Sequence, residues 1–220
     1  MDLTWPPSLP VTQVSATRWQ RSLEGQELSD AAAPTTRRAT GQNGAAMSIE
    51  SAERFFAFLT IAALAGVIVG ISGRVVPSAV VRGLVLTLRS NRLLVGALVA
   101  DTAMVGSLYF SEVGHLTPCL FCWYQRCMMY PLAVILTIAA VRRDDGVRPY
   151  ALALAIIGAL LSSYHYALEW IHSLDTGACS ATVPCTFVYF RQFGFMSLSF
   201  MALAGFLFLI TLFTLPGETS

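Results

Sequence analysis

The apolar run at residues 123–141 is introduced by the stretch PCLFCWYQR at residues 118–126. Proline cannot continue a helix but suits the positions just before one, so this run predicts a helix with Cys119 and Cys122 near its amino end. The free N–H groups and the positive dipole end of such a helix favour a thiolate, the form of cysteine that carries out redox chemistry. The C-x-x-C spacing therefore indicates a redox pair at the edge of an apolar helix.

Five apolar runs divide the chain. Each holds about 20 residues, and a helix of that length crosses a hydrocarbon layer of about 30 Å. The 220 residues are 55% hydrophobic and only 12% charged, with a mean hydropathy of +0.62, which excludes a soluble globular protein. We therefore expect an all-α integral membrane protein, a four-helix transmembrane bundle with one additional N-terminal apolar helix. The runs are residues 55–73, 93–110, 123–141, 150–168 and 193–215.

The segments outside these runs complete the expected domain organisation. Residues 1–54 mix small and polar residues with scattered arginine and no period, which predicts a disordered tail. Met47 lies shortly before the first run, so a start downstream of Met1 is an alternative. The expected order is a disordered tail (1–54), an extra transmembrane helix or anchor (55–73), an arginine-rich cytoplasmic connection (74–92), a four-helix domain that carries the cysteine pairs (93–215) and a cytoplasmic tail (216–220).

The placement of arginine predicts the orientation. All fourteen basic residues are arginine, and the net charge of +1 gives no field that would suggest nucleic acid as a partner. Arginines cluster in the connections at 74–92 and 142–148, which places both in the cytoplasm. The cysteine loops then lie on the opposite face, where disulfides also persist. Residues 55–73 are alternatively a cleaved signal peptide, but cleavage would start the next span from the wrong side, so an uncleaved anchor is favoured.

A second cysteine pair lies downstream. Cys179 and Cys185 sit in a polar segment between the last two apolar runs. Zinc would require all four sulfurs in one tetrahedral cluster, but two apolar runs separate this pair from Cys119 and Cys122, so we expect no metal site. Cys127 is the odd cysteine, and we expect it to pack as a small apolar side chain.

Three residues with acidic or basic side chains lie inside the apolar runs. Arg126 follows Cys122 by one helical turn, where it can hold a thiolate and stabilise negative charge on a reduced quinone; the alternative is an arginine that reaches lipid headgroups. His165 lies near the same outer face and can supply protons near neutral pH, with a buried structural histidine as the alternative. Asp101 falls mid-span, and we favour a hydrogen-bonded aspartate over a functional one.

Together these features resemble the disulfide bond formation protein B family, in particular its protein C-like branch. The resemblance covers residues 90–215, and its motifs agree in order as well as in type. They are GSLYFSE at 106–112, PCLFCWYQR at 118–126, MYPL at 129–132, SYHY at 163–166, and the stretch 179–185 followed by FGF at 193–195.

The resemblance implies a bundle that reoxidises a thioredoxin-like extracytoplasmic dithiol oxidase and passes the electrons to membrane quinone, either ubiquinone or menaquinone. It implies a multi-pass protein of the bacterial cell membrane with its cysteine loops outside. The partner would attack Cys179. Cys185 would then exchange with Cys119, and Cys122 would face the quinone.

The resemblance also implies the cofactor-binding residues, which would be Gln125, Arg126 and His165. Two features depart from the family pattern. The tail and the first apolar run have no counterpart in it, and Asp101 stands where a small apolar residue is expected.

Two other classes of function are alternatives. One is a membrane scaffold whose cysteine pairs are static structural disulfides. The other is a small transporter that uses Asp101 and His165 as a proton relay. Neither alternative depends on Cys122 for its activity, whereas an oxidoreductase needs Cys122 to reduce quinone.

Overall fold

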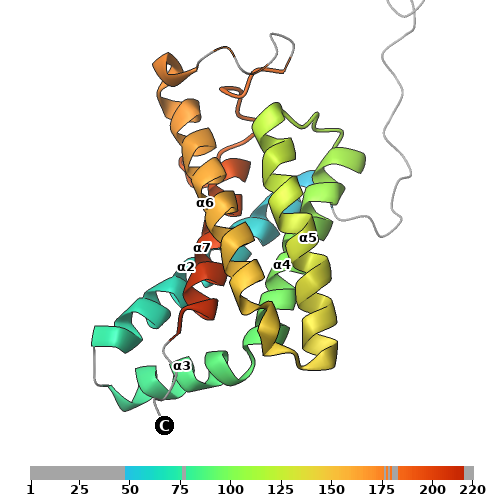
Figure 1. Ribbon diagram of the computed structural model, residues 1–220. Coiled ribbons are helices and arrows are strands. Elements are labelled where there is room, and N and C mark those ends of the chain that lie inside the picture. Colours follow the sequence, from blue (N-terminus) through green and yellow to red (C-terminus); the bar gives the residue numbers. More distant parts are fainter. Residues whose placement is uncertain (1–47, 76–77, 176, 178, 180–182, 216–220) are drawn as a thin grey trace, which may run out of the picture. The chain divides into compact units, whose positions relative to one another are not determined.

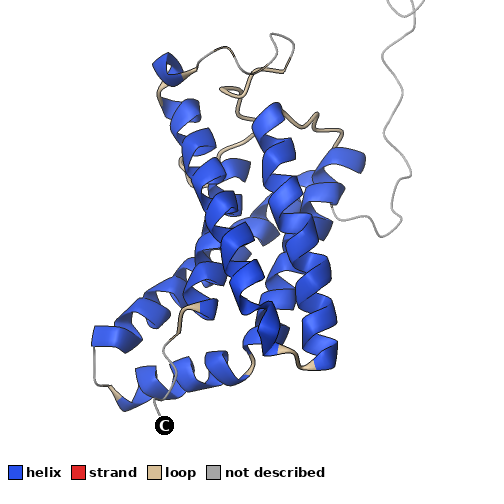
Figure 2. Cartoon of the chain, viewed as in Figure 1, coloured by secondary structure: helices blue, strands red, loops and turns tan. Residues whose placement is uncertain are grey.

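The computed structural model describes residues 48–75, 78–175, 177, 179 and 183–215, and over these residues it is helical without named strands (Figures 1 and 2). The expected disordered tail, residues 1–54, lies outside the described residues as far as residue 47. Residues 49–54 are helical, so the expectation of disorder is wrong for them: Ala52 is buried in the bundle, and Glu50 forms an ion pair with Arg54 one helical turn later. The helices are α2 (Ile49–Val75), α3 (Ala79–Ser90), α4 (Arg92–Glu112), α5 (Leu120–Arg142), α6 (Arg148–Trp170) and α7 (Leu198–Phe213), with short 3-10 turns at Asp145–Val147 and His172–Leu174.

Among the described residues, four helical segments are long and apolar enough to cross a membrane: α2, α4, α5 and the combined segment Asp145–Trp170. The helix α7 is apolar but holds only 16 residues. Pairwise packing joins α4 to α5, α5 to α6 and α6 to α7, while α2 lies against α7. The prediction of an all-α membrane bundle with one additional N-terminal apolar helix is confirmed.

Small residues let the helices approach one another. The core contains alanines at positions such as Ala100, Ala133 and Ala155, and large side chains such as Phe206 and Leu132 fill the spaces between them. Lipid tails are as apolar as leucine, so helix association in a membrane depends on this close van der Waals contact rather than on hydrophobic burial.

Besides α2, which begins six residues before the predicted run, two elements differ from the sequence prediction. The connection at 74–92 contains the helix α3. This helix is amphipathic, with apolar residues on one face and arginines on the other. The sequence analysis counted the arginines in this connection but did not test their spacing for a helical period. The last helix begins at Leu198, five residues after the start of the predicted run. Phe193 and Gly194 have φ angles of 54° and 81°, so the chain turns sharply there before Ser197 caps α7.

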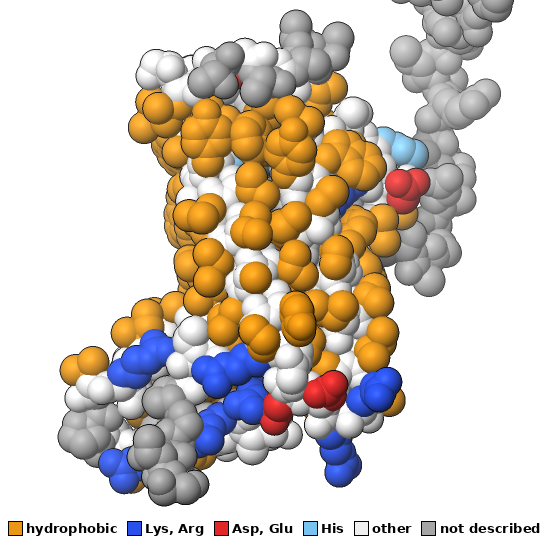
Figure 3. Space-filling model, in the orientation of Figure 1, with side chains coloured by type: hydrophobic (Ala, Val, Ile, Leu, Met, Phe, Trp, Pro, Cys, Tyr) orange, Lys and Arg blue, Asp and Glu red, His pale blue; other side chains and the backbone are white. Residues whose placement is uncertain are grey.

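Charge is distributed unevenly along the bundle. Arginine side chains gather at the lower end of the face shown in Figure 3, the end at which α3 and the start of α6 lie in Figure 1. There Arg92 at the start of α4 forms an ion pair with Asp145, at 2.8 Å. The segment that follows α6 and carries Cys185 lies at the opposite end (Figure 1).

The contact between α6 and α7 depends on Gly158. A methyl group at this position would lie 2.3 Å from the Phe206 ring, which is completely buried and cannot move aside. We expect Gly158→Ala to destabilise the protein by about 1–3 kcal/mol and to lower its thermal unfolding midpoint in detergent.

The matched control for this change is Gly83→Ala on α3, where nothing lies within 4 Å of an added methyl group. Alanine favours a helix over glycine by about 1 kcal/mol, so this midpoint should stay the same or rise. Equal midpoints for the two variants would contradict the close contact between α6 and α7.

Candidate active site

Cys119 and Cys122 form the centre of the site. Cys119 caps the amino end of α5, where its sulfur accepts a hydrogen bond from the backbone N–H of Cys122 at 3.3 Å. The two sulfur atoms lie 2.8 Å apart, and Cys119 is buried whereas Cys122 is partly exposed. The predicted position of the C-x-x-C pair at the start of a helix is confirmed.

The surroundings of Cys119 favour its thiolate. The pKa of Cys119 is lowered from 9.0 to about 4, and the hydrogen bond from the Cys122 thiol is the largest cause. Burial acts in the opposite direction, while the hydrogen bond with His165 and its electrostatic interaction contribute to the lowering of the Cys119 pKa. Cys119 is therefore a strong leaving group in thiol–disulfide exchange.

His165 of α6 lies on the other side of Cys119. Its Nε2 is 3.5 Å from the Cys119 sulfur, and its Nδ1 is 3.1 Å from Nε2 of the buried Gln125. When the Gln125 amide donates to Nδ1, the neutral imidazole carries its proton on Nε2 and donates it to the sulfur. The Phe121 ring stacks on the imidazole at 5.8 Å and holds its orientation.

The second cysteine pair adjoins the first. Cys179 and Cys185 form a disulfide, with their Cα atoms 5.8 Å apart. Cys185 is completely buried and packs in one cluster with Cys119 and Leu168. The predicted pairing of Cys179 with Cys185 is present, and the fold brings the loop pair against the C-x-x-C pair.

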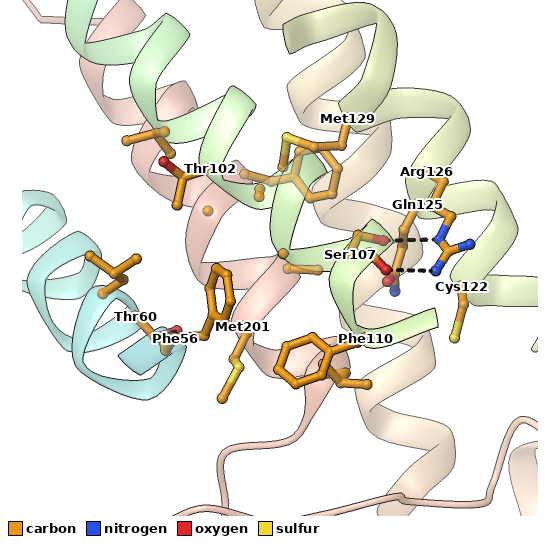
Figure 4. A pocket seen from close by; sticks show the side chains of 18 of the residues that line it. Phe56, Thr60, Thr102, Ser107, Phe110, Cys122, Gln125, Arg126, Met129 and Met201 are labelled. Carbon is orange, nitrogen blue, oxygen red and sulfur yellow. Dashed lines mark hydrogen bonds between the residues drawn. The ribbon is translucent and has the colours of Figure 1, made fainter. Parts of the chain in front are cut away.

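A large apolar cavity of about 500 Å³ begins beside Cys122 and is shown in Figure 4. Its walls come from α2, α4, α5 and α7, and Cys122 lines it whereas Cys119 is absent from the described lining. The few polar groups on its walls include Gln125 and Arg126 of α5 and Ser107 of α4. Its volume and its mostly apolar walls with a few polar groups are those of a small-molecule site.

Arg126 is fixed by α4. Its Nε donates to the Ser107 hydroxyl at 2.9 Å and its Nη2 to the Ser107 carbonyl at 3.0 Å (Figure 4). The guanidinium also lies over the Trp123 ring, 5.1 Å from its centroid. The sequence analysis expected a partner for this intramembrane charge but did not identify Ser107 as that partner.

Comparison with known proteins identifies the family. The family model "Disulfide bond formation protein DsbB" matches residues 89–215, which is more than half of the chain. The chain belongs to the DsbB family. The predicted resemblance is thereby confirmed, and the chain is a multi-pass membrane thiol oxidoreductase with a role in disulfide bond formation.

The curated relatives also support the protein C-like branch. The chain is 47% identical to "Probable disulfide formation protein C 1" of Bacillus cereus over 106 residues, 48% of this chain and 76% of the relative. It is 45% identical to "Disulfide bond formation protein C" of Bacillus subtilis over 124 residues, 56% of this chain and 90% of the relative. No solved structure matches the chain.

A second, small cavity of this DsbB-family chain contains a residue that the sequence analysis missed. About 20 Å³ in volume, it is lined by both C-x-x-C cysteines, His165 and Glu169, and it is large enough for one water molecule. Glu169 is buried; its Oε1 accepts from Ser199 at 2.5 Å, and its Oε2 has no hydrogen-bond partner among the described residues. The available signal was its spacing of four residues from His165 on one helix face.

The same cluster bears on the expectation of no metal site. One ligand atom each from Cys119, Cys122 and His165 lie within 4.8 Å of one another, a spacing at which a metal ion could be held. Three ligands are one fewer than a structural zinc site uses. The absence of a metal stays a prediction.

Asp101 and Cys127 have different outcomes. Thr137 of α5 donates to the Asp101 carboxylate at 2.8 Å, so the expected hydrogen-bonded aspartate is confirmed. Cys127 is exposed on the surface of α5, so the expectation that it packs inside is wrong. It follows the buried Gln125 by two residues, about 200° around the helix, and therefore faces away from the bundle.

The low pKa of Cys119 predicts an unusual pH profile. An ordinary thiol is alkylated ever faster as the pH rises toward 9, whereas Cys119 stays a thiolate until the pH falls through about 4. We expect alkylation of Cys119 in reduced protein, mapped by mass spectrometry, to be nearly independent of pH between 5.5 and 8, the flat range above a pKa of about 4.

The Cys122→Ala variant tests whether the hydrogen bond from Cys122 causes the low pKa of Cys119. It removes the main hydrogen-bond donor, so the midpoint of the Cys119 profile should move upward, and His165→Ala should move it upward by less. Restricted access of the reagent to the buried sulfur slows alkylation by the same factor at every pH, so it does not move the midpoint. A wild-type profile that rises steadily to pH 9 would refute the assignment.

Proposed function

We propose that this protein is a thiol:quinone oxidoreductase. It reoxidises an extracytoplasmic thioredoxin-like dithiol oxidase and passes the electrons to membrane quinone, ubiquinone or menaquinone. One observation carries the proposal: Cys119 packs against the loop cysteine Cys185, while Cys122 opens into the apolar cavity. The C-x-x-C pair thus touches both the donor side and the acceptor side.

The residues around the larger cavity fit a quinone. Its walls are apolar, as a lipid-soluble ring requires, and Gln125 and Arg126 place polar groups beside Cys122. Arg126 would favour negative charge on the reduced ring, while Ser107 holds its guanidinium in place. A bound quinone supplies an acceptor for two electrons and two protons.

The loop pair begins the proposed thiol chemistry. A partner thiolate attacks Cys179, a mixed disulfide forms, and Cys185 leaves as a thiolate. The partner's second thiol then displaces Cys179, so the partner is oxidised to a disulfide and the loop pair gains two electrons. These steps follow from the family resemblance, and the disulfide between Cys179 and Cys185 supports them.

In the next proposed steps, the C-x-x-C pair takes the two electrons from the loop pair. From its oxidised form, Cys185 attacks Cys119 and releases Cys122 as a thiolate; Cys179 then attacks Cys185, and Cys119 leaves. The loop disulfide re-forms and the C-x-x-C pair is now reduced. The lowered pKa of Cys119 favours its departure. Oxidation of this dithiol releases two electrons and two protons, and His165 lies within 3.5 Å of the Cys119 sulfur to exchange a proton.

His165 lies beside the small cavity and not beside the large cavity proposed to hold the quinone. It contacts Cys119 and lines the small cavity, and it is absent from the described lining of the large one. We therefore propose a role for His165 on the thiol side of the site. Quinone contact would rest on Gln125 and Arg126.

The proposed location is the cytoplasmic membrane of a bacterium, with the cysteine loops outside. The gathering of arginine at the end away from Cys185 supports this orientation, because positive residues stay on the cytoplasmic side. Residues 93–215 are the proposed catalytic domain, and the family match over 89–215 supports that boundary. The contacts of α2 with α7 support an anchor that remains part of the protein.

The two rival functions are less well supported. A scaffold with static disulfides does not explain a family of disulfide formation proteins. In a proton-coupled transporter Asp101 and His165 would form one relay, but Asp101 bonds to Thr137 whereas His165 bonds to Cys119 and Gln125.

The test is stopped-flow absorbance of purified protein mixed with a reduced thioredoxin-like partner and quinone. Cys122→Ser removes the sulfur that faces the cavity, so we expect quinone reduction to fall by more than about a hundredfold. Cys127→Ser is the matched control, because this thiol is exposed on the far side of α5, and it should reduce quinone at the wild-type rate. Quinone reduction by the Cys122→Ser variant at the wild-type rate would exclude the proposed function.

A further inference from the structure

The helix α2 precedes the segment that matches the DsbB family, yet it forms part of the acceptor cavity. We propose that α2 is the wall that holds the apolar tail of the quinone, so that the protein favours tailed quinones over tail-less ones. This inference rests on the proposed function. The residues that α2 contributes to the cavity are Phe56, Leu59, Thr60, Ala62 and Ala63.

Close contacts show that α2 is built into the bundle. Gly66 and Gly70 have so little space that an added methyl group would lie 2.3 Å from Phe208 and 2.4 Å from Thr211, both on α7. Glycine at these positions lets the two backbones approach as small residues do in membrane helix pairs. The carboxyl-terminal half of α2 is thus held against α7.

The amino-terminal half of α2 packs against α4. The Phe56 ring lies 5.5 Å from the Phe110 ring and fills the space beside Gly106, where a methyl group would lie 2.4 Å from it. Figure 4 shows Phe56 projecting from α2 toward the cavity, with Phe110 nearby. Without this ring the cavity would be open between α2 and α4.

Polar contacts hold both ends of α2. Near the amino end of α2, Gln192 donates to the Glu53 carboxylate at 2.9 Å. Near its carboxyl end, Arg74 donates to the carbonyl and to the hydroxyl of Thr214, at 3.0 and 2.9 Å. Since these bonds tie α2 to the segments before and after α7, the wall has a defined position.

The cavity is elongated and changes character along its length. Its lining on α4 runs from Val95 to Ser111, about 24 Å at 1.5 Å per residue. Cys122 and Arg126 line it on α5, whereas Ala63 packs with Val95 and other apolar residues around Phe208. A redox ring needs the polar groups near Cys122, and a flexible hydrocarbon chain needs only the apolar walls beyond.

The occupant of the apolar part is therefore the tail of the ligand whose ring lies beside Cys122. The cavity is continuous between the two regions, so one molecule with a ring and a chain can fill both. A lipid acyl chain would also suit the walls. It would bind without regard to the quinone ring, and the experiment below separates the two.

The experiment measures ligand binding and not turnover. Wild-type protein is titrated with a quinone that carries several isoprene units and with the same ring without a tail, and the rise of the thermal unfolding midpoint gives each Kd. Ala63→Phe fills the tail region. We expect it to weaken binding of the tailed quinone about tenfold and to leave the tail-less ring unchanged.

Ala65→Phe is the matched control. Ala65 lies two residues further along the same helix, about 200° around it, and is exposed on the face away from the cavity. Both quinones should bind this variant as they bind the wild type. Equal affinities of the Ala63→Phe and Ala65→Phe variants for the tailed quinone would overturn the inference, and so would an equal loss of both quinones in Ala63→Phe.

A second pair of variants opens the wall instead of filling it, and so does not depend on Ala63→Phe folding. Phe56→Ala should weaken binding of the tailed quinone about fivefold. Phe58→Ala should not, because Phe58 is 64% exposed and is not among the lining residues. Wild-type protein that binds neither quinone would refute the proposed function itself, whereas wild-type binding of the tailed quinone with no difference between Phe56→Ala and Phe58→Ala would refute only the role of α2.

Discussion

The constraint on which the structure depends is that one pair of sulfur atoms must lie between two unlike environments. A helix start meets this constraint, because its capping residue lies outside the helix and a residue three positions later lies one turn inside. Cys119 takes the first position and packs against the buried loop cysteine Cys185. Cys122 takes the second position and opens into the apolar cavity. The C-x-x-C spacing thus has a geometric reason as well as a chemical one.

Polar side chains can surround the dithiol within an apolar bundle because each has a fixed partner. Gln125 pairs with His165, Ser107 pairs with Arg126, and Glu169 accepts from Ser199. An unpaired polar group would be costly in such a medium. These pairs link α4, α5, α6 and α7, so they also fix how the helices are placed around the site. The exception is Oε2 of Glu169, which lacks a partner among the described residues in the small cavity beside the cysteines.

The parts of this arrangement that the sequence predicted are those with a local cause. Apolar length predicted the spans, Pro118 predicted the start of α5, and the position of the cysteines predicted both pairs. The parts that were missed depend on contacts between segments far apart in the chain. The pairing of Ser107 with Arg126 joins two helices, and no local pattern marks it. The late start of α7 depends on the positive φ angle of Phe193, a residue whose type predicts continued helix or strand.

In the proposed function, the lowered pKa of Cys119 has opposite effects on the two electron transfers. A stabilised thiolate favours the reduced form of a dithiol, so it makes the C-x-x-C pair a stronger oxidant of the loop cysteines and draws electrons inward. The same stabilisation opposes the onward transfer, because the reduced pair is then harder to oxidise. The driving force for the second transfer must therefore come from the acceptor and from how tightly it is held beside Cys122. A cavity that binds the whole acceptor, ring and tail, raises its occupancy at this position, and in this chain the wall that completes such a cavity is α2.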